Sequence, residues 1–192
     1  MVYTGPEQLK KSNIIKKVED LPRGWKLSFK LFPFSIVGDL SSVLHATIGN
    51  NDGSNGDRIP GIWLRPNREL YICSSINGNA NFCFFTKTEL PLFNHSTVVV
   101  QQVQSPINYQ YYFQVYVNGK RILDNLNEKP MGFKNVNYFA SDPWFIPAKA
   151  ILTDFDLVTY KHKGIDLIFQ RSHHIIFQCW IYAFFLHDDK VA

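Results

Sequence analysis

The sequence has little net charge and no long helical pattern. Its 20 Lys and Arg residues exceed its 16 Asp and Glu residues by only four, and the lysines are spread along the chain. No basic patch of the kind that binds nucleic acid or an anionic membrane is visible. No segment before residue 162 keeps a 3.6-residue apolar period between helix caps, so we expect little helix.

What is present is alternation of polar and apolar residues, which is typical of half-buried strands. The segment 25–31 alternates without a fault and places Trp25, Leu27, Phe29 and Leu31 on one buried face. Aromatic residues make up 15% of the chain and suit pleated surfaces. Such a chain predicts one all-β domain, built as a two-sheet antiparallel sandwich. Further strands are expected over 41–48, 62–64, 70–75, 80–86, 97–103, 109–117, 120–126 and 151–160.

Two cysteines set the expected register of one hairpin. If Asn77-Gly78-Asn79 is a three-residue turn, Ile76 faces Ala80 and Cys73 lies directly opposite Cys83. A disulfide there would stabilise the fold by roughly 2 to 3 kcal/mol and would persist in an oxidising compartment. The alternative is a pair of buried free thiols in a cytosolic protein.

A second hairpin is indicated by Asn118-Gly119, because both positions of a type I′ turn need a positive φ. This turn would pair Val115 with Ile122. Asn94-His95-Ser96 is an N-glycosylation sequon on an expected loop, which agrees with a secreted protein.

Several motifs, taken in order, resemble those of the concanavalin A-like lectin/glucanase superfamily. More narrowly, they are similar to the laminin-G-like domains of secreted and cell-surface proteins from cnidarians and other invertebrates. The resemblance covers about residues 10 to 160 and implies a jelly-roll sandwich over 10–161, an N-terminal extension over 1–9 and an atypical tail over 162–192. The motifs are Leu21-Pro22-Arg23-Gly24-Trp25, Ser42-Val43-Leu44-His45, Gly56-Asp57-Arg58-Ile59-Pro60-Gly61-Ile62-Trp63, the Cys73 and Cys83 hairpin, Val117-Asn118-Gly119-Lys120, Phe133-Lys134-Asn135-Val136 and Ala140-Ser141-Asp142-Pro143-Trp144.

Hydrolytic chemistry is not indicated. Glycosidases with this fold carry a Glu-x-Asp-x-x-Glu strand, which provides an acid and a nucleophile about 5 Å apart. The late acidic pair here, Asp154 and Asp156, has no Glu beside it, and we interpret it as a solvated strand face. No Gly-x-Ser-x-Gly motif is present either. The prediction is a protein that is not an enzyme.

The resemblance implies a calcium ion at the rim of the sandwich, held by two carboxylates and backbone carbonyls. The loop 51–57 has the oxygen-rich, glycine-containing composition that calcium prefers, although it is not an EF-hand. Asp57 and Asp142 are the predicted metal ligands. The alternative is that Asp57 pairs with Arg58 or caps a turn, while Asp142, before Pro143, makes an Asx-turn.

Glycan binding needs an aromatic platform for the apolar face of a sugar ring, surrounded by polar groups. The candidate ligand-binding residues are Arg58, Asn137, Tyr138 and Trp144. Trp144 lies in a proline-flanked loop and is expected to be exposed. For Trp25 and Trp63 we favour a place in the core.

The two ends do not fit a simple secreted domain. Residues 1–20 are polar and lysine-rich and do not have the apolar run of a signal peptide. We therefore expect either that the signal peptide is missing from this sequence or that the protein is not secreted. The apolar run 175–186 has 12 residues, too few for a transmembrane helix of about 20 residues. We interpret 162–192 as a tail that departs from the family, in which Cys179 has no evident partner.

Together these features predict an extracellular, non-catalytic module that binds carbohydrate. The alternative is a laminin-G-like adhesion module that binds a protein partner with the help of calcium. In both cases we expect no nucleic-acid partner and no transmembrane span.

Overall fold

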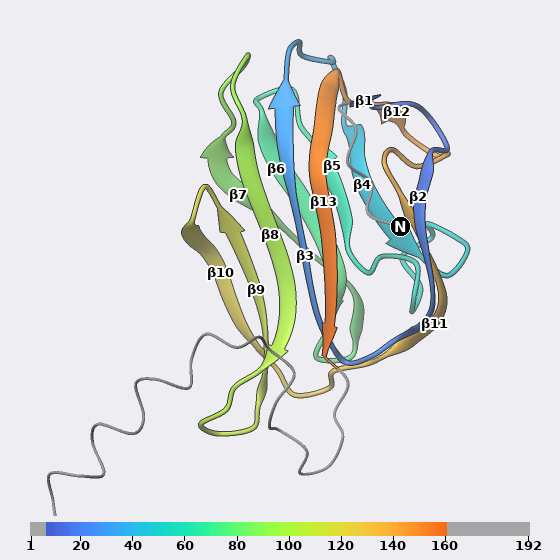
Figure 1. Cartoon of the computed structure of the whole chain (residues 1–192), viewed down its shortest axis with the longest axis vertical. Helices are drawn as coiled ribbons and strands as arrows, with labels where there is room; N and C mark the ends of the chain where they lie inside the picture. Colours follow the sequence, from blue (N-terminus) through green and yellow to red (C-terminus); the bar gives the residue numbers. More distant parts are fainter. Residues whose placement is uncertain (1–6, 161–192) are drawn as a thin grey trace, which may run out of the picture. The chain divides into compact units, whose positions relative to one another are not determined.

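Thirteen β-strands and no helix make up residues 7–160, the part of the chain that the computed structural model describes (Figure 1). Within these residues no helix could therefore cross a membrane. The strands are β1 (Glu7–Gln8), β2 (Ile14–Leu21), β3 (Gly24–Pro33), β4 (Ser41–Thr47), β5 (Gly61–Leu64), β6 (Glu69–Ile76), β7 (Asn79–Glu89), β8 (Ser96–Gln104), β9 (Tyr111–Val117), β10 (Lys120–Asn127), β11 (Phe133–Phe139), β12 (Ile146–Pro147) and β13 (Ala150–Tyr160).

These strands form two sheets that pack face to face. The six-stranded sheet has the order β1-β13-β3-β8-β9-β10. The seven-stranded sheet has the order β2-β11-β4-β5-β6-β7, and β12 adds to it by pairing with β4. All pairs are antiparallel except β12 with β4. The predicted two-sheet antiparallel sandwich is confirmed.

The core lies between the sheets and follows the alternation of the strands. On β3, the four residues predicted to face inward are at most 2% exposed, and Trp25 meets the Phe113 ring edge-on at a centroid distance of 6.3 Å. Leu44, Ile62 and Ile72 fill the same core from the other sheet. Burial of such side chains is worth about 1.5 to 3 kcal/mol each, which is the main term that holds the sheets together.

The first hairpin confirms the disulfide but not the predicted turn. Asn77 and Gly78 both have positive φ and form a two-residue turn, so Ile76 pairs with Asn79 rather than with Ala80. A register shift between Ser74 and Ile76 offsets the shorter turn and brings Cys73 opposite Cys83. The two sulfur atoms are bonded.

The second hairpin has the predicted Asn118-Gly119 turn, with φ of 50° and 78°. The predicted pair of Val115 with Ile122 is wrong. A bulge between Arg121 and Leu123 moves the register by one residue, and Val115 pairs with Leu123. Alternation alone does not reveal a bulge, because the extra residue leaves the pattern on either side intact.

The N-terminal boundary also differs from the prediction. Glu7 and Gln8 pair with β13, and Leu9 is buried in the core, so residues 7–9 belong to the sandwich and not to an extension. Residues 1–6 and the predicted tail over 162–192, with Cys179, lie outside the described residues.

Candidate functional site

A second, smaller cluster of aromatic side chains lies on the outer face of the seven-stranded sheet. Because Ile62 and Leu64 point into the core, Trp63 between them points outward. Trp63, Tyr71 and Phe85 stand opposite one another on β5, β6 and β7. Their ring centroids are 5.9 Å and 4.8 Å apart, and the second pair is stacked. We call this row the aromatic ladder.

Trp63 is covered from above by other rings. The His45 and Phe145 rings meet it edge-on at centroid distances of 5.3 and 5.5 Å, and it is only 1% exposed. Its indole lies back over Gly61, where an added Cβ would stand 2.2 Å from Cη2 of Trp63. Trp63 is thus buried as predicted, but beneath a surface cluster and not in the core between the sheets.

His45 is a fully buried link between two segments of the chain. Its Nδ1 lies 2.9 Å from Oδ2 of Asp142, and its Nε2 lies 2.6 Å from the backbone carbonyl oxygen of Asp57. Both ring nitrogens therefore face oxygen acceptors. Each ring nitrogen can donate an N–H to its oxygen, and the hydrogen bond to the Asp142 carboxylate is charge-assisted.

The Asp142 carboxylate also organises the loop that carries Trp144. Its Oδ1 accepts the backbone N–H groups of Trp144 and Phe145 at 3.0 and 2.8 Å. The backbone N–H of Asp142 donates to Oγ of Ser42 at 2.9 Å. Burial would raise the pKa of Asp142, but the hydrogen bonds from His45 and Phe145 hold the pKa below its ordinary value. The predicted Asx-turn is therefore present, with His45 as a further partner.

Asp57 closes the loop 51–57. Its Oδ2 accepts the backbone N–H groups of Asp52 and Ser54 at 3.0 and 2.9 Å, and the residue is buried. The two predicted calcium ligands thus meet only through His45, which contacts the carboxylate of Asp142 but the main chain of Asp57. Within residues 7–160 no group of three or more His, Cys, Asp or Glu could hold a metal ion. This arrangement does not fit a calcium ion shared by Asp57 and Asp142.

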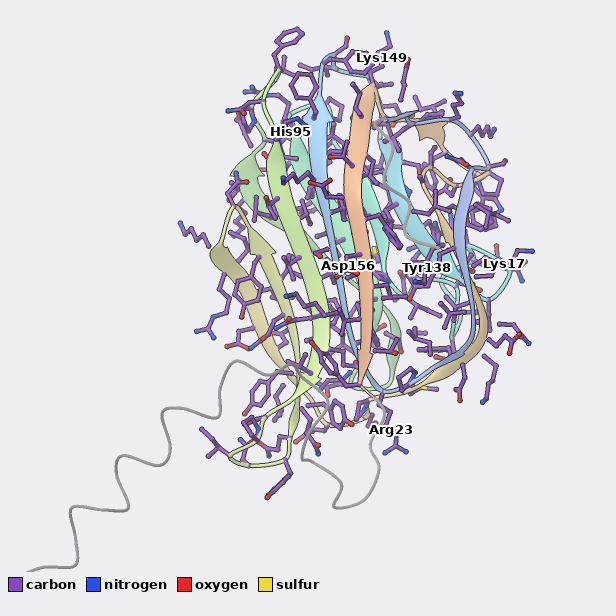
Figure 2. The ribbon with its side chains drawn as sticks, viewed as in Figure 1. Lys17, Arg23, His95, Tyr138, Lys149 and Asp156 are labelled. Carbon is purple, nitrogen blue, oxygen red and sulfur yellow. A yellow bond between two sulfur atoms is a disulfide. The ribbon has the colours of Figure 1, made fainter. Side chains whose placement is uncertain are left out.

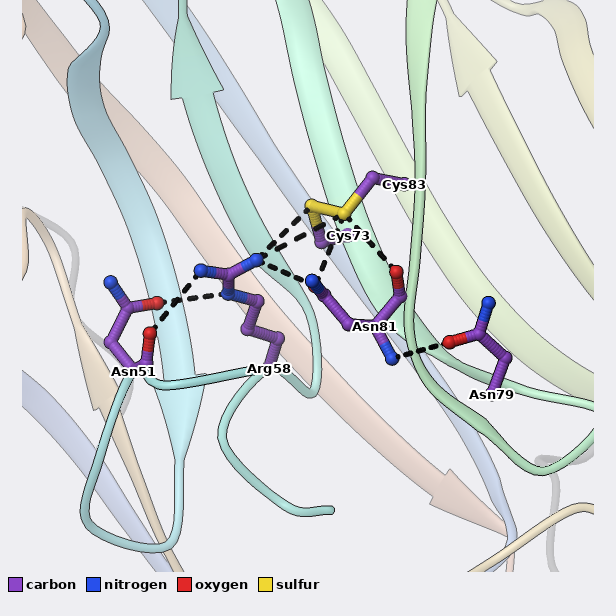
Figure 3. Close-up of a disulfide and its surroundings, with 6 residues drawn as sticks. All are labelled: Asn51, Arg58, Cys73, Asn79, Asn81 and Cys83. Carbon is purple, nitrogen blue, oxygen red and sulfur yellow. Dashed lines mark hydrogen bonds between the residues drawn. A yellow bond between two sulfur atoms is a disulfide. The ribbon is translucent and has the colours of Figure 1, made fainter. Parts of the chain in front are cut away.

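Arg58 is fixed against the same face (Figure 3). Its Nε and one terminal nitrogen donate to the side-chain oxygens of Asn51 and Asn81 at 2.9 and 2.5 Å. The guanidinium stands 5.2 Å from the centroid of the Trp63 ring and within 4.0 Å of both sulfur atoms of the disulfide. Asn51 and Asn81 were not predicted as site residues, since nothing in the sequence indicates that the loop 51–57 meets the start of β7.

The other predicted ligand residues lie in different surroundings. Trp144 is 41% exposed and packs against His45 and Phe139 at centroid distances of 5.3 and 6.4 Å. Asn137 is half-buried on β11, on the same side of that strand as Phe139.

Tyr138 points the other way, into the core between the sheets, where it contacts Phe155 (Figure 2). It has no exposed surface, and burial raises its pKa above the ordinary value of 10.0. Because alternate residues of a strand face opposite sides, Asn137 and Tyr138 cannot both serve one surface. Tyr138 does not belong to a surface site.

Asn94, the predicted glycosylation site, is exposed in the loop between β7 and β8, and its side-chain oxygen accepts the N–H of His95 at 2.8 Å. Its modification stays a prediction.

No protein-family model matches the chain, and no curated protein sequence matches it. Solved structures with a similar fold include a heptameric SAP-like pentraxin from Limulus polyphemus, which is 13% identical with a TM-score of 0.51 over 81% of this chain and 73% of the pentraxin. Domain 4 of a GH43 extracellular arabinanase from Geobacillus stearothermophilus, solved in complex with arabinotriose, is 15% identical with a TM-score of 0.48 over 74% of this chain and 65% of its own. Sheep galectin-11 is 17% identical with a TM-score of 0.47 over 76% of this chain and 98% of its own.

At these identities the likeness concerns the fold. The chain has the concanavalin A-like jelly-roll sandwich fold, as predicted. The narrower laminin-G-like assignment is not confirmed.

Proposed function

We propose that this protein is a non-catalytic, lectin-like module that binds a glycan on the outer face of the seven-stranded sheet. The observation that carries the proposal is a series of ring contacts that ends in exposed aromatic surface. The series runs from Phe85 through Tyr71, Trp63 and His45 to Trp144. Phe85 and Trp144, at its two ends, are 44% and 41% exposed.

Sugar rings present apolar C–H faces and polar hydroxyl edges, so they need both aromatic and hydrogen-bonding partners. On this face the polar groups are held in place. Arg65 lies 4.3 Å from the centroid of the Phe85 ring and pairs with Glu69 at 3.1 Å, while Arg58 is fixed by Asn51 and Asn81. Fixed side chains lose little conformational entropy when a ligand binds, which favours recognition of a weakly held ligand.

The acidic residues near this face support binding over hydrolysis. Asp57 and Asp142 are buried and accept backbone N–H groups. Glu69 and Glu89 stand opposite one another on β6 and β7, but each forms an ion pair with an arginine, Arg65 and Arg68 respectively. Both carboxylates on this face are therefore already engaged by arginine partners.

An extracellular location belongs to the same proposal. It is supported by the Cys73–Cys83 disulfide, since disulfides persist in oxidising compartments, and by the exposed sequon at Asn94.

The test is a glycan array probed with the purified protein, with calcium and with a chelator. We expect binding that is reduced at least tenfold by Trp144→Ala and that survives chelation. Phe93→Ala, which removes a 70% exposed aromatic side chain from the β7–β8 loop, is the matched control and should keep binding. Equal binding by the Trp144 variant and the wild type would reject this site. Loss of binding on chelation would instead support the calcium-dependent prediction.

A further inference from the structure

The outer face of the six-stranded sheet carries a row of polar side chains joined by hydrogen bonds across three strands. Gln101 on β8, Gln114 on β9 and Asp124 on β10 stand opposite one another. Gln101 Nε2 donates to Oε1 of Gln114 at 2.7 Å, and Gln114 Nε2 donates to Oδ1 of Asp124 at 3.0 Å. We call these three residues the glutamine row. Each amide orients the next, so the row presents its remaining donors and acceptors in fixed directions.

Two tyrosines and an arginine complete this surface. Tyr112 and Tyr116 lie on either side of Gln114 along β9 and are half-buried, because they alternate with the inward-facing Phe113 and Val115. Tyr116 Oη donates to Oε1 of Gln114 at 3.2 Å. Arg121 pairs with Asp124 at 2.7 Å and keeps its side chain 56% exposed. Aromatic faces thus flank polar groups whose positions are already set.

The charges on this surface indicate what kind of ligand it suits. Arg121 and Asp124 neutralise one another, and the two glutamines and two tyrosines are uncharged. Beside the row, the same face carries one charge of each sign, Lys26 on β3 opposite Gln101 and Asp156 on β13. A surface of this kind has no net attraction for an anionic or a cationic partner. Protein interfaces usually centre on large apolar or aromatic anchors that fill a pocket. Of the large hydrophobic side chains exposed within residues 7–160, Tyr160 alone belongs to this face, and it lies at the end of β13.

We propose that this face is a second binding surface, distinct from the one near Trp144, and that it binds a neutral polysaccharide chain laid across β8, β9 and β10. Neighbouring strands are about 4.8 Å apart, so the glutamine row spans roughly 10 Å. That length suits an extended chain better than a single sugar. The tyrosine rings would contact sugar C–H faces, while the glutamine amides, Asp124 and Arg121 would bind hydroxyl groups.

The test is native affinity electrophoresis of the full chain in gels that contain laminarin, soluble xylan, galactomannan or hydroxyethyl cellulose. We expect at least one polymer to retard the wild type. Gln114→Ala and Tyr116→Ala should each weaken that retardation about tenfold, the factor for one lost interaction of about 1.4 kcal/mol. Thr97→Ala, an exposed position on the same face of β8 but outside the row, should match the wild type.

The variants also separate this proposal from the one near Trp144. Retardation that Trp144→Ala preserves and the β9 variants lose supports the second surface, whether or not the glycan array identifies a ligand at the first. The proposal is overturned if no polymer retards the wild type, or if only Trp144→Ala loses retardation. A dimer in sedimentation velocity that dissociates in Tyr116→Ala would also overturn it, because the face would then be a contact between copies. Thermal melting checks the fold, and Arg121→Ala replaces any β9 variant that does not fold.

Discussion

Removal of the Asp142 side chain gives the most decisive test of the network beneath Trp144. Asp142→Ala would leave three donors without an acceptor, namely the buried His45 ring and the part-buried N–H groups of Trp144 and Phe145. Breaking a buried hydrogen-bonded pair costs about 3 to 5 kcal/mol, because the remaining partner stays desolvated. For a domain of this size we expect a fall in Tm of roughly 10 °C.

Asp142→Asn separates charge from geometry. The asparagine oxygen can still accept both backbone N–H groups, and its amide can donate to Nδ1 of a neutral His45. We therefore expect a smaller cost of about 1 to 2 kcal/mol, since neutral hydrogen bonds replace charge-assisted ones. Asp154→Asn is the control, because it removes only an exposed ion pair with Lys30. Urea unfolding measures all three variants. An Asp142→Ala variant within 1 kcal/mol of wild type would refute the reasoning.

The pKa of Asp142 is lowered on folding, so its contribution to stability is complete above the ordinary value of 3.8 and is lost as the pH falls through the folded-state pKa. Between about pH 6 and pH 2, urea unfolding should therefore show a smaller loss of stability for Asp142→Asn than for wild type. Replacing Cys73 and Cys83 together by serine should lower the free energy of unfolding by about 2 to 3 kcal/mol, and an unchanged denaturation midpoint would contradict this. Gly61→Ala should cost about 1 to 3 kcal/mol because the new methyl group meets the Trp63 ring, whereas Gly38→Ala, with no atom within 4 Å, should be near neutral in the same thermal melts.

The period-two pattern predicted most of the sandwich because it reflects which side of each strand is buried. It predicted the inward face of β3. The pairing of Cys73 with Cys83 was predicted from a three-residue turn, and it holds because a register shift between Ser74 and Ile76 offsets the shorter turn. The pattern failed where a strand carries an extra residue, as in the Arg121 bulge, since a bulge is set by the twist of the local pair and leaves no compositional mark. β4 is buried on both faces along its whole length, because the loop around Asp142 covers its outer side. The sequence of β4 alone does not indicate that its outer face is buried.

The candidate site was predicted only in part for a similar reason. Arg58 and Trp144 lie on the outer face of the seven-stranded sheet, but the residue that links their loops, His45, was given no role. A histidine in a strand carries no signal of its partners when they are far away along the chain. The glutamine row was visible in principle, because Tyr112, Gln114 and Tyr116 alternate with buried residues on β9. Its cross-strand partners depend on register, which the bulge in β10 altered.

The disulfide has a consequence for how this protein could aggregate. Within the described residues β7 is an edge strand, with β6 as its neighbour. Its first eight residues, Asn79 to Thr86, are uncharged and include three phenylalanines. Exposed edges of this composition are templates for pairing with other chains. The Cys73–Cys83 bond ties the middle of β7 to β6, so the strand can fray only towards its ends. Reduction would remove this covalent tie and leave β7 held to β6 by hydrogen bonds and packing alone. The redox state of the surroundings would then set how easily the edge strand separates and pairs with another chain.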